Sequence, residues 1–185
     1  SFAMRLPLVD GHGNFGSLDD GPAAPRYTEA RMAAAAQALT GDLDEDVVDF
    51  VPNFDNQFQH PGVLPAAYPA LLVNGATGIA VGMATNMAPH NLREVVAGAR
   101  HLILNPEASL EELMKIVPGP DLPSGGRIVG LEGIRDAYRT GRGSFKTRAK
   151  VSVEQVSPRK QGIVVTELPY MVGPEKVTEK IKDAV

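Results

Sequence analysis

The sequence predicts an α+β fold divided into two units, and three observations support this. Of the 185 residues, 43% are hydrophobic and 22% are charged, which is typical of a globular chain with a substantial core. Apolar stripes with helical spacing and segments that alternate apolar with polar residues both occur. The acidic, proline-spaced segment 42–70 follows an alanine-rich segment and precedes the later elements. We therefore expect residues 1–45 and residues 46–185 to be separate units.

The first unit is expected to contain one strand and one helix. Leu6–Val9 is typical of a short strand, and it leads into a glycine-rich loop or hairpin. Glu29–Leu39 has the highest helix propensity in the chain, and Thr28 is placed to cap that helix. Tyr27 would then lie just outside a helix N-terminus.

The second unit is expected to contain three short helices after residues 71–91, a stretch whose small residues do not distinguish helix from strand. Asn91 and Ser109 each precede a glutamate by three residues, so each is expected to cap a helix. The third helix is expected over Leu131–Arg139, closed by Gly141.

The last part of the chain predicts a hairpin followed by a helix. Ser144–Val156 alternates cationic and apolar residues, which indicates a strand with one basic side. After a turn, Gly162–Tyr170 is expected to return as its partner strand. Pro174 is expected at the first position of a final amphipathic helix.

Composition and charge exclude several classes of function. The absence of cysteine excludes disulfides, thiolate metal sites and cysteine nucleophiles. No apolar run approaches the ~18 to 20 residues of a membrane helix, so we expect a cytoplasmic protein with no membrane contact. The formal net charge is −4, with three basic and ten acidic residues in 1–90 against fifteen and twelve in 91–185. Any contact with DNA is therefore expected through a local patch or with help from outside this chain.

Such a patch is offered by basic residues around the third helix and the strand that follows it. Solvated helix and strand faces often have this composition, so contact with DNA phosphates and simple solvation both remain open. The set consists of Arg135, Arg139, Arg142, Lys146, Arg148 and Lys150.

Arg26 and Tyr27 form the most distinctive pair in the sequence. A phenol has a pKa of about 10 and is a poor nucleophile at neutral pH unless a cation or a base favours phenolate. The adjacent guanidinium and the partial positive charge at the expected helix N-terminus supply such a field, and both can hold a phosphate diester. The pair is chemically suited to forming a phosphotyrosine bond, although an Arg-Tyr dipeptide is also typical of packing beside a surface charge.

The glycine-rich stretch Gly75–Gly82 lacks the lysine and hydroxyl ending of a P-loop, so it does not indicate a nucleotide site. Ile79 in this stretch is suited either to core burial or, at a loop tip, to wedging between DNA base steps. The four histidines lack metal-ligand spacing and the acidic residues 42–49 are typical of a solvated edge, so no metal is assigned.

Seven segments, in chain order, resemble the A subunit of bacterial type IIA DNA topoisomerases. The resemblance extends over nearly the whole chain, and the GHGNFG, GGRIVG and TELPYMVGPEKV strings resemble topoisomerase IV more than gyrase. The segments are LPLVDGHGNFGS, RYTEAR, VDFVPNFD, LLVNGATGIAVGMATNMAPHNL, GPDLP, DAYRTGRGSF and TELPY.

This resemblance implies a fold and a chemistry. Residues 1–45 correspond to the C-terminal part of a winged-helix domain, and residues 46–185 to the first part of a mixed α/β tower domain. Tyr27 is then the residue that attacks a DNA phosphodiester and becomes linked to the new 5′ end, while Arg26 steadies the phosphate. Ile79 is the residue that intercalates and bends the DNA.

The resemblance also implies partners and cofactors. The substrate is double-stranded DNA in the cytoplasm, at the nucleoid. The A subunits form a homodimer and join two B subunits in an A2B2 heterotetramer that passes one duplex through another with ATP. Both ATP and Mg²⁺ are expected on the B subunit, with no cofactor and no metal in this chain, and the 185 residues alone are expected to cleave nothing.

Two departures from the family pattern favour an alternative. Pro25 stands where the family usually has methionine, and the loop Asp19–Pro25 is about one residue short. In the alternative, the chain is a non-catalytic scaffold that contacts DNA through its basic surface. A small-molecule enzyme is a third class of function, for which the sequence offers no constellation of residues.

Overall fold

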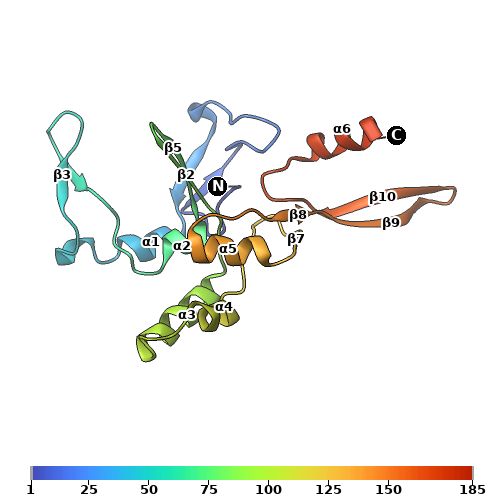
Figure 1. Ribbon diagram of the computed structural model, residues 1–185. Helices are drawn as coiled ribbons and strands as arrows, with labels where there is room; N and C mark the ends of the chain where they lie inside the picture. Colours follow the sequence, from blue (N-terminus) through green and yellow to red (C-terminus); the bar gives the residue numbers. More distant parts are fainter. Residues whose placement is uncertain (1, 185) are drawn as a thin grey trace.

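The computed structural model describes residues 2–184 and has the mixed α+β composition that the sequence predicts. Figure 1 shows the elements along the chain. The first part contains β1 (Val9–His12), the 3₁₀ turn η1 (Pro25–Tyr27), β2 (Glu29–Met32), α1 (Ala34–Thr40), the 3₁₀ turn η2 (Leu43–Glu45), β3 (Phe50–Pro52), β4 (Gln59–Pro61), α2 (Ala70–Asn74), β5 (Ala76–Ala80) and β6 (Met83–Met87). The second part contains α3 (Leu92–Leu104), α4 (Leu110–Ile116), β7 (Arg127–Val129), α5 (Glu132–Thr140), β8 (Lys146–Arg148), β9 (Lys150–Ser157), β10 (Lys160–Glu167) and α6 (Pro174–Ala184).

The chain has an open shape with little buried surface. Its accessible surface is 13946 Å², whereas a compact monomer of its 19.6 kDa mass exposes about 8,600 Å². Over residues 2–184, the strands form five separate two-stranded antiparallel sheets. Figure 1 shows the hairpins β3–β4, β5–β6 and β9–β10 projecting in different directions from the central helices. Among residues 2–184 the buried apolar side chains are few: Ala36, Leu39, Val73, Pro89, Val95, Leu122 and Ile134.

The N-terminal elements differ from the prediction. The first strand begins at Val9 rather than Leu6, and Glu29–Met32 is its antiparallel partner instead of the start of a helix. The Thr28 hydroxyl donates to the Pro25 carbonyl (3.2 Å) and caps no helix. Pairing with a distant strand overrides the helix propensity of this segment, so α1 begins only after it. Tyr27 is consequently the last residue of a 3₁₀ turn and does not lie at the N-terminus of α1, which begins at Ala34.

The connection between the two expected units contains structure of its own. Strands β3 and β4 pair within residues 42–70, with Phe50 opposite Pro61. The ambiguous stretch 71–91 contains α2 and then the β5–β6 hairpin, in which Ala76 lies opposite Met87.

The predicted helix ends in the second half are confirmed. Asn91 Oδ1 accepts hydrogen bonds from two backbone N–H groups of α3, and Ser109 forms a capping box with Glu112 on α4. Gly141 ends α5 in the left-handed conformation, with φ 74°. The capping residues predict these helix ends correctly because each cap depends on contacts within about one helical turn.

The predicted C-terminal hairpin and helix are also confirmed, with one correction. The expected strand 144–156 divides at Ala149 into β8 and β9. The first part pairs with β7, an element that sequence analysis missed, and the second pairs with β10. Helix α6 begins at Pro174, as expected.

Candidate nucleic-acid interface

The turn η1 presents Arg26 and Tyr27 together at the surface. Pro25 occupies its first position, and Ala24 before it has the extended conformation (φ −61°, ψ 143°) that a following proline favours. The Tyr27 side chain is 70% exposed, and Arg26 Cζ lies 4.8 Å from the centroid of its ring. A phenol this exposed is reachable by a macromolecule, with a cation already beside it.

The loop after β1 fits closely around this turn. At Gly13, with φ 101°, an added Cβ would lie 3.1 Å from the Tyr27 carbonyl oxygen and 3.2 Å from Thr28 Cγ2. Asn14 shapes the same loop, because its Oδ1 accepts from the Gly16 N–H (2.8 Å) and its carbonyl accepts from the Ala23 N–H (3.0 Å). Only glycine therefore lets this loop approach the backbone that carries the tyrosine.

The β1–β2 hairpin beside the turn carries one charge pair. Asp10 and Arg31 lie opposite one another in the register, and Arg31 Nε is 2.6 Å from Asp10 Oδ2. Among residues 2–184, Arg26 has no carboxylate partner at ion-pair distance. The guanidinium next to the phenol is thus available for an anion, whereas the neighbouring one is already neutralised.

Ile79 lies near the tip of the β5–β6 hairpin rather than in a core. It is 95% exposed and pairs across the hairpin with Ala84. Val81 and Met83 at the same tip are also highly exposed, and Gly82 closes the turn with φ 82°. The hairpin therefore ends in an apolar wedge, and the core-burial interpretation of Ile79 is wrong.

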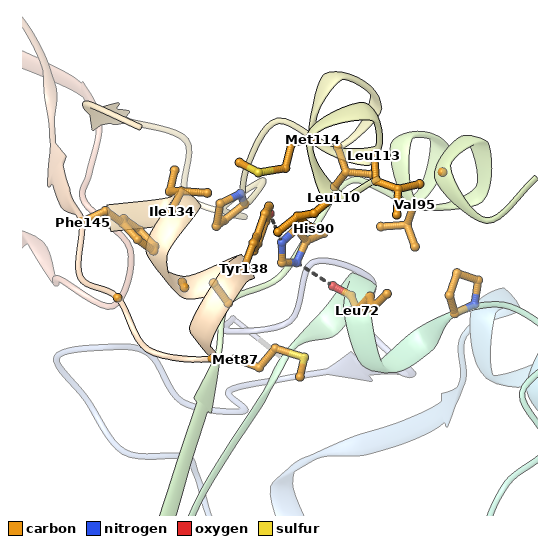
Figure 2. A pocket seen from close by; sticks show the side chains of 18 of the residues that line it. Leu72, Met87, His90, Val95, Leu110, Leu113, Met114, Ile134, Tyr138 and Phe145 are labelled. Atoms are coloured by element: carbon orange, nitrogen blue, oxygen red, sulfur yellow. Dashed lines mark hydrogen bonds between the residues drawn. The ribbon is translucent and has the colours of Figure 1, made fainter. Parts of the chain in front are cut away.

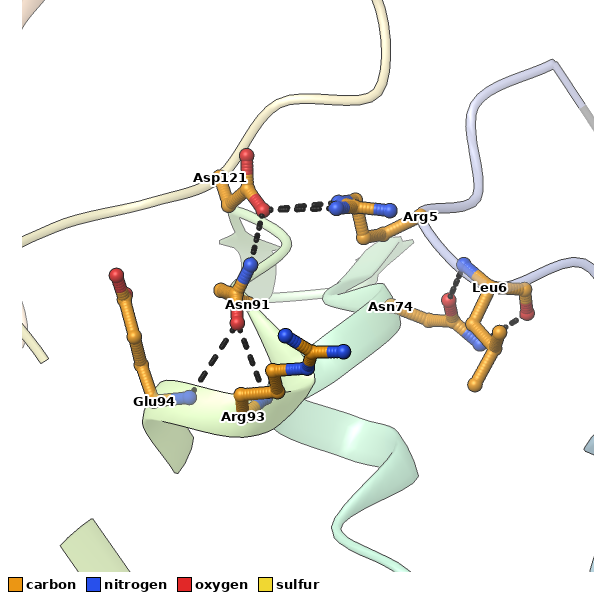
Figure 3. A network of polar contacts seen from close by, with 7 residues as sticks. All are labelled: Arg5, Leu6, Asn74, Asn91, Arg93, Glu94 and Asp121. Carbon is orange, nitrogen blue, oxygen red and sulfur yellow. Dashed lines mark hydrogen bonds and ion pairs between the residues drawn. The ribbon is translucent and has the colours of Figure 1, made fainter. Parts of the chain in front are cut away.

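A polar network ties the base of the tyrosine-bearing segment to the base of this wedge (Figure 3). The side-chain amide of Asn74, at the end of α2, accepts from the Leu6 N–H (2.7 Å) and donates to the Leu6 carbonyl (3.0 Å). Arg5 donates from Nε to Asp121 Oδ2 (3.0 Å), which also accepts from Asn91 Nδ2 (2.8 Å). The chain just before β1 and the helix just before β5 are thereby held together.

The predicted basic residues are all exposed, but their charges are not all free. Arg139 pairs with Glu111, and Lys150 Nζ lies 3.2 Å from Glu167 Oε1. The Gly126 N–H and then Lys150 hold the pKa of Glu167 below its usual range. No ion-pair partner lies near the other four within the described chain. These are Arg135, Arg142, Lys146 and Arg148.

One member of this surface was not predicted from the sequence. Arg127 on β7 lies directly opposite Arg148 on β8, and Val129 lies opposite Lys146. Two like charges on paired strands repel one another unless an anion lies between them. The three-residue strand Arg127–Val129 gives too short an alternation to be found by periodicity, so only the pairing shows the cluster.

A cavity of about 720 Å³ lies among α3, α4 and α5 and is lined mainly by apolar side chains (Figure 2). His90 Nδ1 donates to the Leu72 carbonyl (3.1 Å), so its Nε2 accepts from the Tyr138 hydroxyl (2.6 Å). Burial lowers the pKa of His90 and raises the pKa of Tyr138 to about 12, which keeps the pair neutral. Since these polar atoms satisfy one another, the pair organises the core rather than a reaction.

Two further properties bear on the kind of site. Across residues 2–184, no three histidine, aspartate or glutamate side chains gather as a metal ion would require. In the same part of the chain, every helix is too short or too polar to cross a bilayer.

Comparison with known proteins places these features in context. The family model that describes the A subunit of DNA gyrase/topoisomerase IV matches residues 1–185. The chain is 52% identical to the DNA gyrase A subunit of Granulibacter bethesdensis over 185 residues, and 54% identical to the chloroplastic/mitochondrial DNA gyrase A subunit of Arabidopsis thaliana over 189 residues. A third relative, the DNA gyrase A subunit of Synechocystis, is 53% identical over 190 residues.

All three alignments cover 100% of this chain but only 20% to 22% of the relatives. The chain thus spans about a fifth of the length of the curated relatives that it matches. Because these relatives are named gyrase, the expected preference for topoisomerase IV finds no support.

Proposed function

Because this chain belongs to the family of DNA gyrase and topoisomerase IV A subunits, we propose that it is part of the DNA breakage-and-reunion subunit of a type II DNA topoisomerase. The observation that carries this proposal is the exposed Tyr27 phenol with Arg26 against its ring. The apolar wedge of β5–β6 and the exposed basic surface around β7 and β8 provide further support.

In the proposed reaction, Tyr27 Oη attacks the phosphorus of a DNA phosphodiester. The new bond joins Oη to phosphorus, and the bond from phosphorus to the 3′ oxygen breaks, so the 5′ phosphate stays on the tyrosine. The phenol loses its proton to a base, and the departing 3′ oxygen gains one. Arg26 compensates the negative charge that grows on the phosphoryl oxygens.

The reverse attack by the 3′ hydroxyl restores the strand. A phosphotyrosine diester replaces a phosphodiester of the same kind, so resealing needs no external energy source. We propose that ATP and Mg²⁺ are bound by the B subunit, as the resemblance to the topoisomerase A subunits implies. The DNA substrate, the A2B2 assembly and a cytoplasmic location at the nucleoid belong to the same proposal.

Ile79 is proposed to insert between base steps of the bound duplex. Its side chain is almost fully exposed on a narrow two-stranded hairpin, whose shape fits a DNA groove. Unstacking a step costs a few kcal/mol, and a bent duplex offsets that cost by meeting more protein surface. The basic surface around Arg148 is a candidate for that further contact. We further propose that residues 1–45 end a winged-helix domain and residues 46–185 begin a tower domain.

The test is the Tyr27→Phe variant of the intact A subunit combined with its B subunit. The change removes one oxygen from an exposed side chain, so the variant is expected to fold and to bind DNA normally. DNA covalently attached to protein and strand passage should both be lost completely. Tyr68→Phe is the matched control, because the Tyr68 hydroxyl makes only a long hydrogen bond to the Ala35 carbonyl (3.4 Å). Covalent adducts formed by Tyr27→Phe would refute the proposal.

The exposed basic surface favours a second candidate, a scaffold that grips DNA without cleaving it. A scaffold would bind DNA with a steep dependence on salt and form no covalent adduct, whether or not Tyr27 is present. This alternative is excluded if the wild-type protein cleaves DNA and the Tyr27→Phe variant does not.

A further inference from the structure

The β3–β4 hairpin carries aromatic side chains that residues 2–184 leave exposed and that the proposed chemistry does not use. Phe54 at its tip is 97% exposed and Phe58 is 71% exposed, while Phe50 at its base is also exposed. Figure 1 shows this hairpin projecting far from the central helices. An aromatic ring in water contributes nothing to folding, whereas rings of this kind anchor protein interfaces.

The tip is held in a defined shape by its own hydrogen bonds. Asn53 Oδ1 accepts from the backbone N–H groups of Gln57 (3.1 Å) and Phe58 (3.2 Å). The Asn53 N–H donates to the Phe58 carbonyl (2.8 Å), and Asn56 adopts the left-handed conformation with φ 58°. Phe54 is therefore presented on a preorganised loop, which lowers the entropy cost of binding through it.

The charge around the hairpin determines what kind of partner fits. Residues 32–92 contain no lysine and no arginine. Six exposed carboxylates lie before and on the hairpin, and within the described chain none of them forms an ion pair. DNA phosphate is repelled by such a surface, whereas a basic protein surface is attracted to it. The six are Asp42, Asp44, Glu45, Asp46, Asp49 and Asp55.

The hairpin is not joined to a larger sheet within residues 2–184. In that part of the chain β3 and β4 pair only with each other, over the three residue pairs from Phe50–Pro61 to Pro52–Gln59. An isolated two-stranded hairpin is marginally stable in water. A partner that buries its aromatic side chains would stabilise it.

We propose that the β3–β4 hairpin is a docking surface for a basic face of the B subunit, with an apolar recess that takes the Phe54 ring. The identity of the partner rests on the proposed function; the chemistry of the surface does not. Phe54 supplies the apolar anchor, and the carboxylates before and beside it supply attraction and orientation.

The test measures binding of the purified B subunit to the intact A subunit, without DNA, at several salt concentrations. Phe54→Ala should weaken binding at least about tenfold, as expected for an aromatic anchor at an interface. Asp55→Lys should weaken binding most at low salt, because added salt screens the charge that it reverses. Ile163→Ala on β10 and Glu179→Lys on α6 are matched controls, also at exposed positions, and should change little.

The outcomes separate this inference from the proposed function. Unchanged affinity of Phe54→Ala for the B subunit overturns the docking surface and leaves the chemistry of Tyr27 untouched. Loss of DNA binding or of A-subunit dimerisation in Phe54→Ala, with B-subunit affinity retained, also overturns it, since the hairpin would then contact DNA or a second copy. Failure of the wild-type A subunit to bind B overturns both the docking partner and the proposed assembly.

Discussion

Replacing Gly13 with alanine is expected to slow DNA cleavage about fourfold without preventing folding of the protein. The added Cβ would lie 3.1 Å from the Tyr27 carbonyl oxygen and 3.2 Å from Thr28 Cγ2, where ordinary contact begins at 3.4 Å. The atom that must retreat belongs to the backbone of the tyrosine, so the phenol moves with it. The φ of 101° adds strain of about 1 to 3 kcal/mol for a residue with a side chain.

The expected loss follows from the size of that movement. Misplacing a reacting group by 1 Å costs about a hundredfold in rate, so a retreat of about 0.3 Å, from 3.1 Å to 3.4 Å, should cost about fourfold. The assay is rapid mixing of the assembled A and B subunits with DNA, followed by quantification of DNA attached to protein over time. Denaturant unfolding of each variant separates lost geometry from lost stability.

The matched control lies in the same loop. Gly21→Ala adds a Cβ that meets nothing within 4 Å, at a glycine without positive φ, so its cleavage rate should equal that of the wild type. A Gly13→Ala rate within about twofold of the wild type would refute the claim that this loop positions Tyr27. Equal losses in both variants would refute it as well.

Two further predictions concern the core and the basic surface. Burial holds the pKa of His90 in the folded protein below its usual 6.5, so the unfolded chain binds more protons below that pH. The free energy of unfolding should therefore fall as the pH drops below about 6.5, by at most about 1.4 kcal/mol per pH unit. Denaturant unfolding midpoints measured between pH 7.5 and 5.5 check this prediction, with His60→Gln as the control at an exposed histidine. If the midpoint of His90→Gln depends on pH as steeply as that of the wild type, the prediction is wrong. Arg148→Ala should make the plot of log DNA affinity against log salt concentration shallower, by about 0.9 in slope. Arg139→Ala should change this slope less, because Glu111 already compensates the charge of Arg139. Equal slopes for the two variants, measured by titration, would argue against phosphate contact at Arg148.

Signals confined to one turn or one hairpin were predictable from the sequence. Asn91, Ser109 and Gly141 each mark a helix end through contacts within a few residues, and the β9–β10 hairpin follows from alternation on both sides of a turn. The start of α6 at Pro174 was also predictable from a local signal, because the N–H that proline lacks is not needed at the first helical position.

Non-local pairing explains what the sequence did not reveal. Thr28 followed by Glu29 has the composition of a helix start, yet β1 recruits Glu29–Met32 into a sheet. The break of the basic strand at Ala149 depends on β7 and β10 competing for neighbouring residues, which no local pattern records. Arg127 joins the basic surface only through that pairing.

The candidate site shows the same division. The pairing of Arg26 with Tyr27 follows from adjacency in the sequence, and the structure adds the exposure of the ring and the close fit of Gly13. The network from Asn74 to Leu6 spans 68 residues of sequence, so only the folded chain brings its members together.

The division of the strands into isolated pairs has a consequence for the behaviour of this chain when it is produced alone. Throughout the described residues, each strand has one hydrogen-bonded neighbour, which leaves its other side with unmatched amide and carbonyl groups. Strand β9 is eight residues long and exposes Val151, Val153 and Val156. An exposed strand edge of this kind is a template for pairing with another copy of the chain. The 185-residue chain produced alone should therefore precipitate readily and depend on chaperones during synthesis.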